Sequence, residues 1–373
     1  MAPMSESATL IPETTAAPTP LANLLQGESP HLTLRMHAGA LTPGNFSSTD
    51  EEIAAAATGV AIFDSGYRTR IRVTGEDRLR WLNGMVSNAV QTLPEGSGNY
   101  NFILNAQGRI QGDAYIYRTS DSLLLDTDRS QAARLLAHLD HFIIMDDVEL
   151  RPLDEVTSGI GLAGPQAAAM LDSLGLSASG LAPLQFVETS IAGHAVTLLH
   201  AYSPLIPRYE IWFSPDHTAA LWKSLIAAGA KPIGIETLES LRVLEGIPRY
   251  GIDFNDRYLA QETSQTRALN FTKGCYLGQE IVERIRSRAT VHRYLRQLEL
   301  HGETPTAPTD ILAAGDTSSL GQLTSIAAIR LPGLSATLAL GFIRTEALER
   351  KASLEYTGGM ATVLDHLPAL PRS

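Results

Sequence analysis

The residues best suited to chemistry lie in one stretch, Phe271–Arg284, which contains the only cysteine of the 373-residue chain. Cys275 follows Lys273 closely and precedes a predicted helix start. A thiol near an ammonium group and just ahead of a helix N-terminus is in the setting where proteins keep a reactive thiolate. A lone cysteine is more often a small buried apolar residue. The immediate sequence therefore leaves both a reactive and a structural role open.

The neighbours of Cys275 suggest a tightly built loop. Gly274 and Gly278 indicate that backbone approaches another group closely. We expect Lys273 to support the thiolate, and Gln279 and Glu280 to hydrogen-bond to the helix start.

Three roles for the thiol remain open: a redox-sensitive group, a nucleophile, or a metal or cluster ligand shared with a partner. One cysteine cannot hold an iron–sulfur cluster, which normally needs four ligands. Hydrolase chemistry would need a histidine base, and His292 is the nearest in sequence.

The elements that would position such a site begin with a mixed α/β unit. Alternation over residues 67–73 predicts a strand, and apolar spacing over 76–90 predicts an amphipathic helix. Residues 100–105 and 110–117 flank Ala106–Arg109, which is typical of a β-hairpin. The alternating Arg68, Arg70 and Arg72 suggest a solvated strand face.

Two further units follow along the chain. Residues 159–234 show a β-α-β-β-α order with a last strand expected near Lys231–Gly234, which matches a ferredoxin-like unit. A helix is predicted over 234–246. From Tyr294 onward, short strands predict a small antiparallel barrel.

The composition limits the classes of protein to which this chain can belong. The hydrophobic fraction of 44% and charged fraction of 18% are typical of a soluble globular chain. A net charge of −11 argues against a general nucleic-acid or anionic-membrane binder. We see no secretion signal and no membrane span, so we expect a cytoplasmic protein. The Ala-, Pro- and Thr-rich residues 1–45 are predicted to be a disordered tail.

The segment from residue 273 to residue 296 is locally positive, although the chain as a whole is acidic. Its basic residues are Lys273, Arg284, Arg286, Arg288, Arg293 and Arg296. Such a patch could receive a polyglutamate tail, a tRNA or an acidic partner, or it could be a solvated helix face.

The run Lys273-Gly274-Cys275-Tyr276-Leu277-Gly278-Gln279-Glu280 resembles the signature of the YgfZ-type folate-binding proteins. Weaker landmarks over about residues 45–365 resemble the larger glycine-cleavage T-protein (aminomethyltransferase-like) fold. These landmarks are Gly59–Asp64, Tyr100–Tyr117, Gly164-Pro165, Tyr209–Ile211 and Leu241–Gly246.

The resemblance implies an α+β protein with three domains around a central folate channel. The first, folate-binding domain would comprise residues 46–152 plus 235–290. The ferredoxin-like domain would comprise 153–234, and the C-terminal β-barrel 291–373.

The resemblance also implies site residues and a cofactor, tetrahydrofolate or a derivative. Glu210 matches the family's pterin-gripping glutamate and Arg242 a channel arginine. Tyr100 and Asp113 match hairpin positions that contact folate and place an aspartate at the reacting carbon. With Cys275 and Lys273, Asp113 is a candidate catalytic residue.

Two departures from the T-protein pattern bear on activity. The first of the usual paired hairpin aspartates is Gly112, and residues 202–208 replace a Gly-rich run before Tyr209. We therefore expect a folate-binding accessory protein for iron–sulfur cluster assembly or repair, including the clusters of tRNA-modifying enzymes. Its partners would be assembly factors or client iron–sulfur enzymes. A folate-dependent aminomethyl or one-carbon transferase or demethylase, and a non-catalytic scaffold, are the alternatives.

Overall fold

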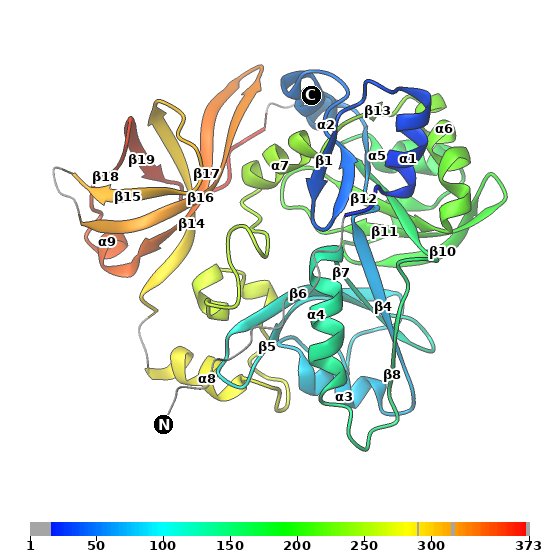
Figure 1. Cartoon of the computed structure of the whole chain (residues 1–373), viewed down its shortest axis with the longest axis horizontal. Helices are drawn as coiled ribbons and strands as arrows, with labels where there is room; N and C mark the ends of the chain where they lie inside the picture. The colour runs from blue at the N-terminus through cyan, green and yellow to red at the C-terminus, as the bar shows by residue number, and fades with distance from the viewer. Residues whose placement is uncertain (1–15, 289–290, 315–317, 371–373) are drawn as a thin grey trace, which may run out of the picture.

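The computed structural model describes residues 16–288, 291–314 and 318–370. It contains two open sheets and a closed barrel, with the barrel on the left of Figure 1 and the sheets one above the other on the right. The mixed α/β architecture with a C-terminal barrel, expected from the sequence, is confirmed. Within the described ranges, no helix is long and apolar enough to cross a membrane.

The lower sheet in Figure 1 has the strand order β5-β6-β7-β4-β8 and contains the predicted hairpin. Its strands are β4 (Arg68–Thr74), β5 (Ser97–Leu104), β6 (Ile110–Arg118), β7 (Leu123–Asp128) and β8 (Glu149–Pro152). Apolar residues of one face pack in a common core with α3 (Arg78–Met85) and α4 (Arg129–Asp140). Helix α3 ends earlier than predicted because Val86 is extended. The other face of the sheet is free to carry polar groups.

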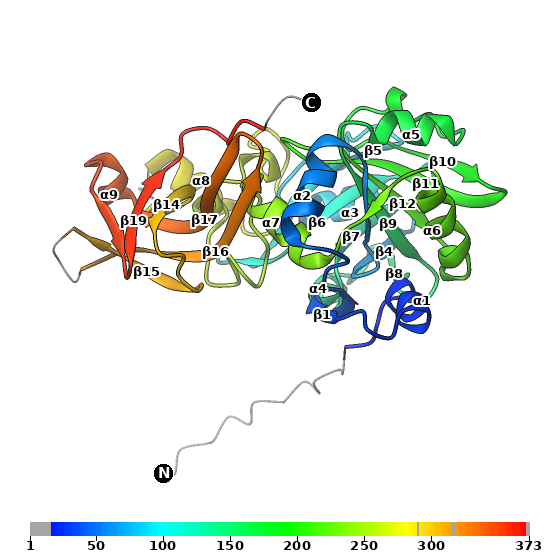
Figure 2. The ribbon, with the colours of Figure 1, turned by 90° about the horizontal axis from the view of Figure 1, so that it is seen from above.

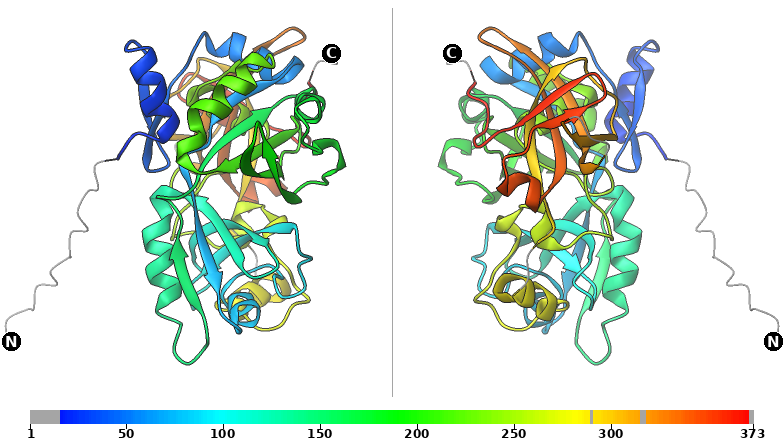
Figure 3. Two further views of the ribbon diagram at one scale, coloured as in Figure 1. Left: turned by 90° about the vertical axis from the view of Figure 1, so that its right-hand side faces the viewer. Right: turned by 90° about the vertical axis from the view of Figure 1, so that its left-hand side faces the viewer.

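The second sheet has the order β10-β11-β12-β9-β3-β13 and lies above the first in Figure 3. Its elements are β3 (Ala61–Asp64), β9 (Ser158–Ala163), α5 (Ala167–Ser173), β10 (Phe186–Ile191), β11 (His194–Ala201), β12 (Arg208–Phe213), α6 (Thr218–Ala227) and β13 (Lys231–Pro232). Strands β9, β11, β12 and β13 with α5 and α6 follow the predicted order.

Two strands extend that pattern. Strand β10, which we did not predict, pairs with β11. Strand β3, from the region we assigned to the first unit, lies antiparallel to β9 and parallel to β13. All of β3 is buried, which suits a strand inside a sheet covered on both faces.

The barrel closes in the order β14-β17-β16-β15-β18-β19. Its elements are β14 (Arg293–Gly302), β15 (Thr309–Ala313), β16 (Ser319–Leu331), β17 (Leu334–Arg344), α9 (Thr345–Glu349), β18 (Leu354–Tyr356) and β19 (Gly359–Val363). The sequence pattern predicted strands over residues 295–300, 320–326, 336–343 and 352–354, which correspond to β14, β16, β17 and β18, and it missed β15 and β19.

The prediction of a disordered tail over residues 1–45 is wrong for residues 16–45; residues 1–15 lie outside the described ranges. Residues 16–45 form α1 (Pro20–Glu28) and a hairpin of β1 (Leu34–His37) and β2 (Ala40–Pro43). Leu21 and Leu25 of α1 are buried in the core of the second sheet. Thr19 caps α1, and its hydroxyl donates to the buried Asp64. The Pro- and Thr-rich composition of the segment did not indicate this apolar contact.

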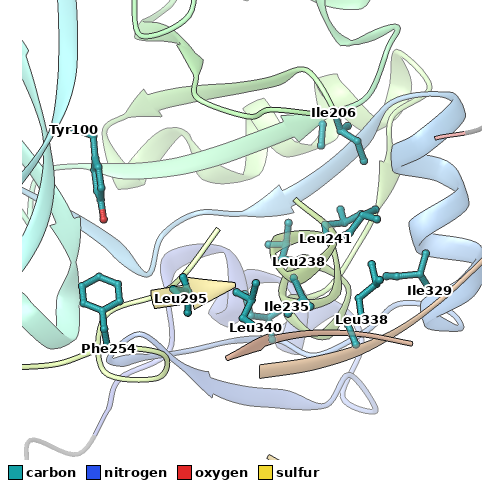
Figure 4. Close-up of a cluster of buried hydrophobic side chains, with 14 of the residues drawn as sticks. Tyr100, Ile206, Ile235, Leu238, Leu241, Phe254, Leu295, Ile329, Leu338 and Leu340 are labelled. Carbon is teal, nitrogen blue, oxygen red and sulfur yellow. The ribbon is translucent and has the colours of Figure 1, made fainter. Parts of the chain in front are cut away.

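Helix α7 (Ile235–Leu244) joins the parts of the molecule. Figure 2 shows it between the barrel and the sheets, and Figure 4 shows Leu238 and Leu241 near Leu338 and Leu340 of the barrel. These residues share one core with Tyr100 of the first sheet. The core also includes α2 (Thr49–Thr58), while α8 (Gln279–Arg288) contributes Val282. One apolar core therefore connects α7 with the first sheet and the barrel.

Candidate functional site

A pocket of about 150 Å³ lies between the first sheet, strand β12, helix α7 and the loop after α7. Tyr100, Asp113, Glu210 and Arg242 all line it. The structure thus brings together the four residues for which the sequence predicted a shared site. The tertiary arrangement supplies what the sequence could not, because these residues come from segments far apart in the chain.

The register of the first sheet places a row of polar side chains along the pocket. Tyr100 pairs with Tyr115, Tyr115 with Asp126, and Asp126 with Arg70. Residues opposite each other on paired strands share a face of the sheet. Apolar residues on the other face, among them Ile103, Ile116 and Leu125, pack against α3 and α4. Strand alternation therefore separates the core of this unit from its candidate site.

Asp113 is held by two neutral donors. The Tyr100 hydroxyl donates to its Oδ2 at 2.5 Å, and Gln131 Nε2 donates to its Oδ1 at 2.8 Å. Gln131 Oε1 in turn accepts from the backbone N–H of Asp113 at 3.0 Å. Burial, followed by the Asp113 charge, raises the pKa of Tyr100 well above its usual value, so the phenol stays a donor. The carboxylate is oriented without being neutralised by a cation.

Gly112 gives a structural account of the missing hairpin aspartate. A Cβ at this position would lie 2.7 Å from Leu135 Cδ2 and 2.8 Å from Gln131 Oε1. The position thus faces helix α4, on the side of the strand opposite to Asp113. Glycine leaves room for the Gln131 amide that orients Asp113, and its presence does not remove an acid from the pocket.

The arginines of β4 do not form the solvated face that their alternation suggested. Arg70 is only 1% exposed, and its Nε lies 3.0 Å from Asp126 Oδ1. Arg68 is mostly buried and pairs with Asp126 at 2.5 Å and Asp128 at 3.0 Å. The expectation is wrong for both residues because the carboxylates of β7 pair with them and Glu210 of β12 faces Arg70.

Glu210 reaches the pocket from β12. Its Oε2 accepts from the Trp212 indole N–H at 2.9 Å and lies 3.7 Å from Arg70 NH2. These contacts hold one carboxylate oxygen. The side chain remains partly exposed at the pocket wall.

Arg242 is already engaged in structural contacts. Its NH1 donates to Asp253 at 2.6 Å and to the Ile247 carbonyl at 2.9 Å. Its NH2 donates to Glu239 at 2.9 Å and to Ser325 of the barrel at 2.8 Å. Arg242 therefore links α7 to the barrel and forms part of the pocket wall.

Several lining residues were not predicted from the sequence, and His37 and Arg267 are two of them. His37 belongs to the N-terminal hairpin, and burial, aided by Arg249, lowers its pKa to about 2 and keeps the ring neutral. Arg267 has its Cζ 4.1 Å from the Tyr100 ring centroid and 4.0 Å from that of Tyr202. No local sequence signal marked either residue, although Arg267 lies shortly before the cysteine stretch.

The cysteine stretch lies outside this pocket. Cys275 is exposed on the loop that precedes α8, and it does not line the pocket. Tyr276 is buried, and Gly278 has a φ of +82° with the Asn105 carbonyl 2.6 Å from where a Cβ would stand. Gln279 Oε1 accepts from the Tyr276 N–H at 3.3 Å, whereas Glu280 is exposed. The expected close approach of backbone is confirmed at Gly278 and is wrong for Gly274, where an added Cβ would meet no atom of the described residues within 4 Å. Gly278 and the buried Tyr276 thus shape a loop that presents the thiol to solvent.

Lys273 is directed toward helix α3. Its Nζ donates to the carbonyls of Asn83, Val86 and Asn88 at 2.6, 2.7 and 2.8 Å. Burial lowers the pKa of Lys273 to about 7, while three carbonyl acceptors favour its charged form. All three ammonium donors are used, so Lys273 fastens the loop to the end of α3.

The basic segment is partly neutralised. Arg293 pairs with Glu262 at 2.9 Å, and Arg286 with Glu283 at 3.4 Å. Arg296 donates to Ser264 at 2.9 Å. Arg284 lines a separate cavity beside α8, and the side chain of Arg288 lies outside the described residues. The segment is therefore less positive than its composition indicated.

Comparisons with known proteins agree with this architecture. Residues 34–273 match the family described as the GCVT N-terminal domain. The chain is 27% identical over 339 residues to an aminomethyltransferase of Thermus thermophilus, covering 90% of this chain and 94% of the relative. It is 29% identical over 256 residues to an aminomethyltransferase of Chlorobium chlorochromatii, covering 66% and 69%.

The crystal structure of the glycine cleavage system aminomethyltransferase T from Bartonella henselae superposes with a TM-score of 0.82 at 20% identity, covering 94% of this chain and 96% of that one. The predicted T-protein-like fold is confirmed. Because the family match spans more than half of the chain, this protein belongs to the GCVT N-terminal domain family.

Proposed function

We propose that this protein binds tetrahydrofolate in the pocket between its sheets and acts in folate-dependent transfer of a one-carbon unit. The observation that supports this best is the meeting of Tyr100, Asp113 and Glu210 in one cavity. The relatives named above are aminomethyltransferases. The orientation of Gly112 away from the cavity removes one objection to transfer.

The donor set suits a reduced pterin. The pterin presents amine and amide N–H groups, and a carboxylate can accept a pair of them. Glu210 has one oxygen engaged by Trp212 and lies at the pocket wall, so its other oxygen can accept from the ligand. Tyr67, Tyr115 and Tyr202 also line the pocket and supply flat surfaces for a ring.

Each residue then has a distinct task. The bound folate supplies the carrier atoms for the one-carbon unit. Asp113, held by Tyr100 and Gln131, orients an amine in the pocket and can take up its proton. Glu210 fixes the pterin, and the Arg242 contacts hold α7 in place beside it.

Titration calorimetry tests the folate site directly. Glu210→Gln is expected to weaken tetrahydrofolate binding about 10-fold or more, because it removes a charged acceptor. Glu188→Gln, an exposed glutamate on the edge strand β10 of the same sheet, is the matched control and should bind like the wild type. Absence of tetrahydrofolate binding by the wild-type protein would contradict the proposal.

A second candidate function rests on the exposed thiol. The stretch around Cys275 resembles that of YgfZ-type proteins, and Cys275 is exposed on a loop that Lys273 fastens to the end of α3. We propose that this thiol serves iron–sulfur assembly factors or client iron–sulfur enzymes, including enzymes that modify tRNA. Cluster binding would require ligands from the partner, because the chain has one cysteine.

Complementation tests this second candidate. A bacterial strain lacking its own YgfZ-type protein should recover iron–sulfur enzyme activity when it expresses the wild-type chain. Cys275→Ala should fail to restore it, while Ser287→Ala on the exposed side of α8 should restore it. Full recovery with Cys275→Ala would remove the thiol from the function.

A further inference from the structure

Most charges that line the pocket are neutralised by the protein itself. Arg68 pairs with Asp126 and Asp128, and Arg208 pairs with Glu245. Arg242 and Arg249 both contact Glu239. Glu210 faces Arg70. Within the described lining, this leaves Arg267 and Asp113 without an ion pair.

Arg267 is a rigidly held cation. Its guanidinium lies against the faces of Tyr100 and Tyr202, and its NH1 donates to the Tyr115 hydroxyl at 2.9 Å. Its Nε donates to Gln265 at 3.2 Å. A guanidinium has five N–H donors, so donors on NH1 and NH2 remain available to a ligand in the pocket. The forked arrangement of these donors matches a carboxylate.

Asp113 is the matching anion. Its two hydrogen-bond donors, Tyr100 and Gln131, are neutral and leave its charge uncompensated. Both unpaired groups contact the same ring, because Asp113 bonds to the Tyr100 hydroxyl and Arg267 lies over the Tyr100 face. The cation and the anion are therefore held apart at a distance set by one tyrosine.

We propose that Arg267 and Asp113 form a subsite for a small zwitterion, an amino acid whose carboxylate binds Arg267 and whose ammonium binds Asp113. A ligand with both charges neutralises both groups, whereas a ligand with one charge leaves the other group unpaired in a partly desolvated pocket. This inference rests on the proposed function, since it names the class of molecule that shares the folate pocket.

Calorimetry on the full chain, with and without tetrahydrofolate, tests the subsite. Glycine, β-alanine and 4-aminobutyrate place the two charges at increasing separation, and propionate and propylamine carry one charge each. At least one of the zwitterions should bind about 10-fold or more tightly than both single-charge compounds. Equal binding of zwitterions and single-charge compounds, or no binding of any of them, overturns the inference.

Variants test whether Arg267 binds the carboxylate of the ligand and Asp113 its ammonium. Arg267→Gln should abolish the preference for the zwitterion over propylamine, and Asp113→Asn should abolish its preference over propionate. Arg267→Lys, which keeps the charge, should retain part of the affinity. Arg80→Gln removes an exposed arginine that does not line the pocket and should leave the binding of every compound unchanged. Thermal unfolding of each variant verifies that it is folded.

The outcomes separate this inference from the folate proposal. If tetrahydrofolate binds and no amino acid does, the zwitterion subsite is wrong and the folate site stands. If Arg267→Gln weakens tetrahydrofolate while amino acids never bind, the carboxylate on Arg267 belongs to the folate, and the zwitterion inference is overturned. Zwitterion binding without any tetrahydrofolate binding would instead contradict the proposed function.

Discussion

Replacing Arg70 with leucine is expected to lower the free energy of unfolding by about 3–5 kcal/mol. Arg70 is 1% exposed, contacts Asp126 and Glu210, and lies with its Cζ 4.2 Å from the Trp212 ring centroid. Without Arg70, Asp126 pairs only with Arg68 among the described residues, and Glu210 loses the cation beside it. A buried carboxylate that loses its partner keeps its desolvation cost, which is why one-sided removal is so destabilising.

The same strand offers a matched control for this substitution. Arg72 lies two residues further along β4, on the same face, but it is 40% exposed and pairs with the exposed Asp121. Arg72→Leu should change the free energy of unfolding by no more than about 1 kcal/mol. Urea unfolding followed by circular dichroism measures both variants. Similar small losses for the two variants would show that the buried network contributes little.

Replacing Lys273 with methionine is expected to lower the free energy of unfolding by about 3 kcal/mol. Methionine keeps an unbranched side chain of similar length but leaves the carbonyls of Asn83, Val86 and Asn88 without their shared donor. These carbonyls end helix α3 and begin the turn into β5, so the loss should loosen both α3 and the cysteine loop. Hydrogen exchange at residues 83–90 and 270–278 should increase.

Two further variants make this prediction specific. Lys223→Met removes a lysine that is 64% exposed and should leave stability nearly unchanged. Cys275→Ala should also be nearly neutral, because the side chain is exposed. If Lys273→Met were as stable as the wild type, the lysine would be free to act on the thiol, as the sequence first suggested. A large loss in Cys275→Ala would mean that the cysteine is structural.

The candidate site could be predicted in part because its residues belong to local patterns. Tyr100 and Asp113 lie on a hairpin with a clear turn signal, and Glu210 lies in an apolar strand. Their resemblance to family landmarks then suggested a common pocket. Arg242 was placed in the right pocket, but its contacts with Asp253 and Ser325 depend on a loop and a barrel strand that no local pattern connects to α7.

Other features depended on contacts between distant segments. The alternation of Arg68 and Arg70 is the same for a solvated face and for a buried ionic face, and only the carboxylates of β7 and β12 distinguish the two. The N-terminal segment resembled a disordered tail because its few apolar residues are buried against another domain element and not against each other. His37 lines the pocket for the same reason, because the N-terminal hairpin packs against other segments of the chain.

The sequence by itself determined many of the strands and helices, the C-terminal barrel and the hairpin that carries Tyr100 and Asp113, because hydrophobic periodicity and turn residues act over short distances. The tertiary structure decided which charges are left for a ligand. Ion pairs form between side chains from different segments. Arg242 pairs with Asp253, whereas Arg267 and Asp113 have no ion pair within the described part of the chain and both contact Tyr100. It also directed Lys273 to a helix end and Cys275 to solvent.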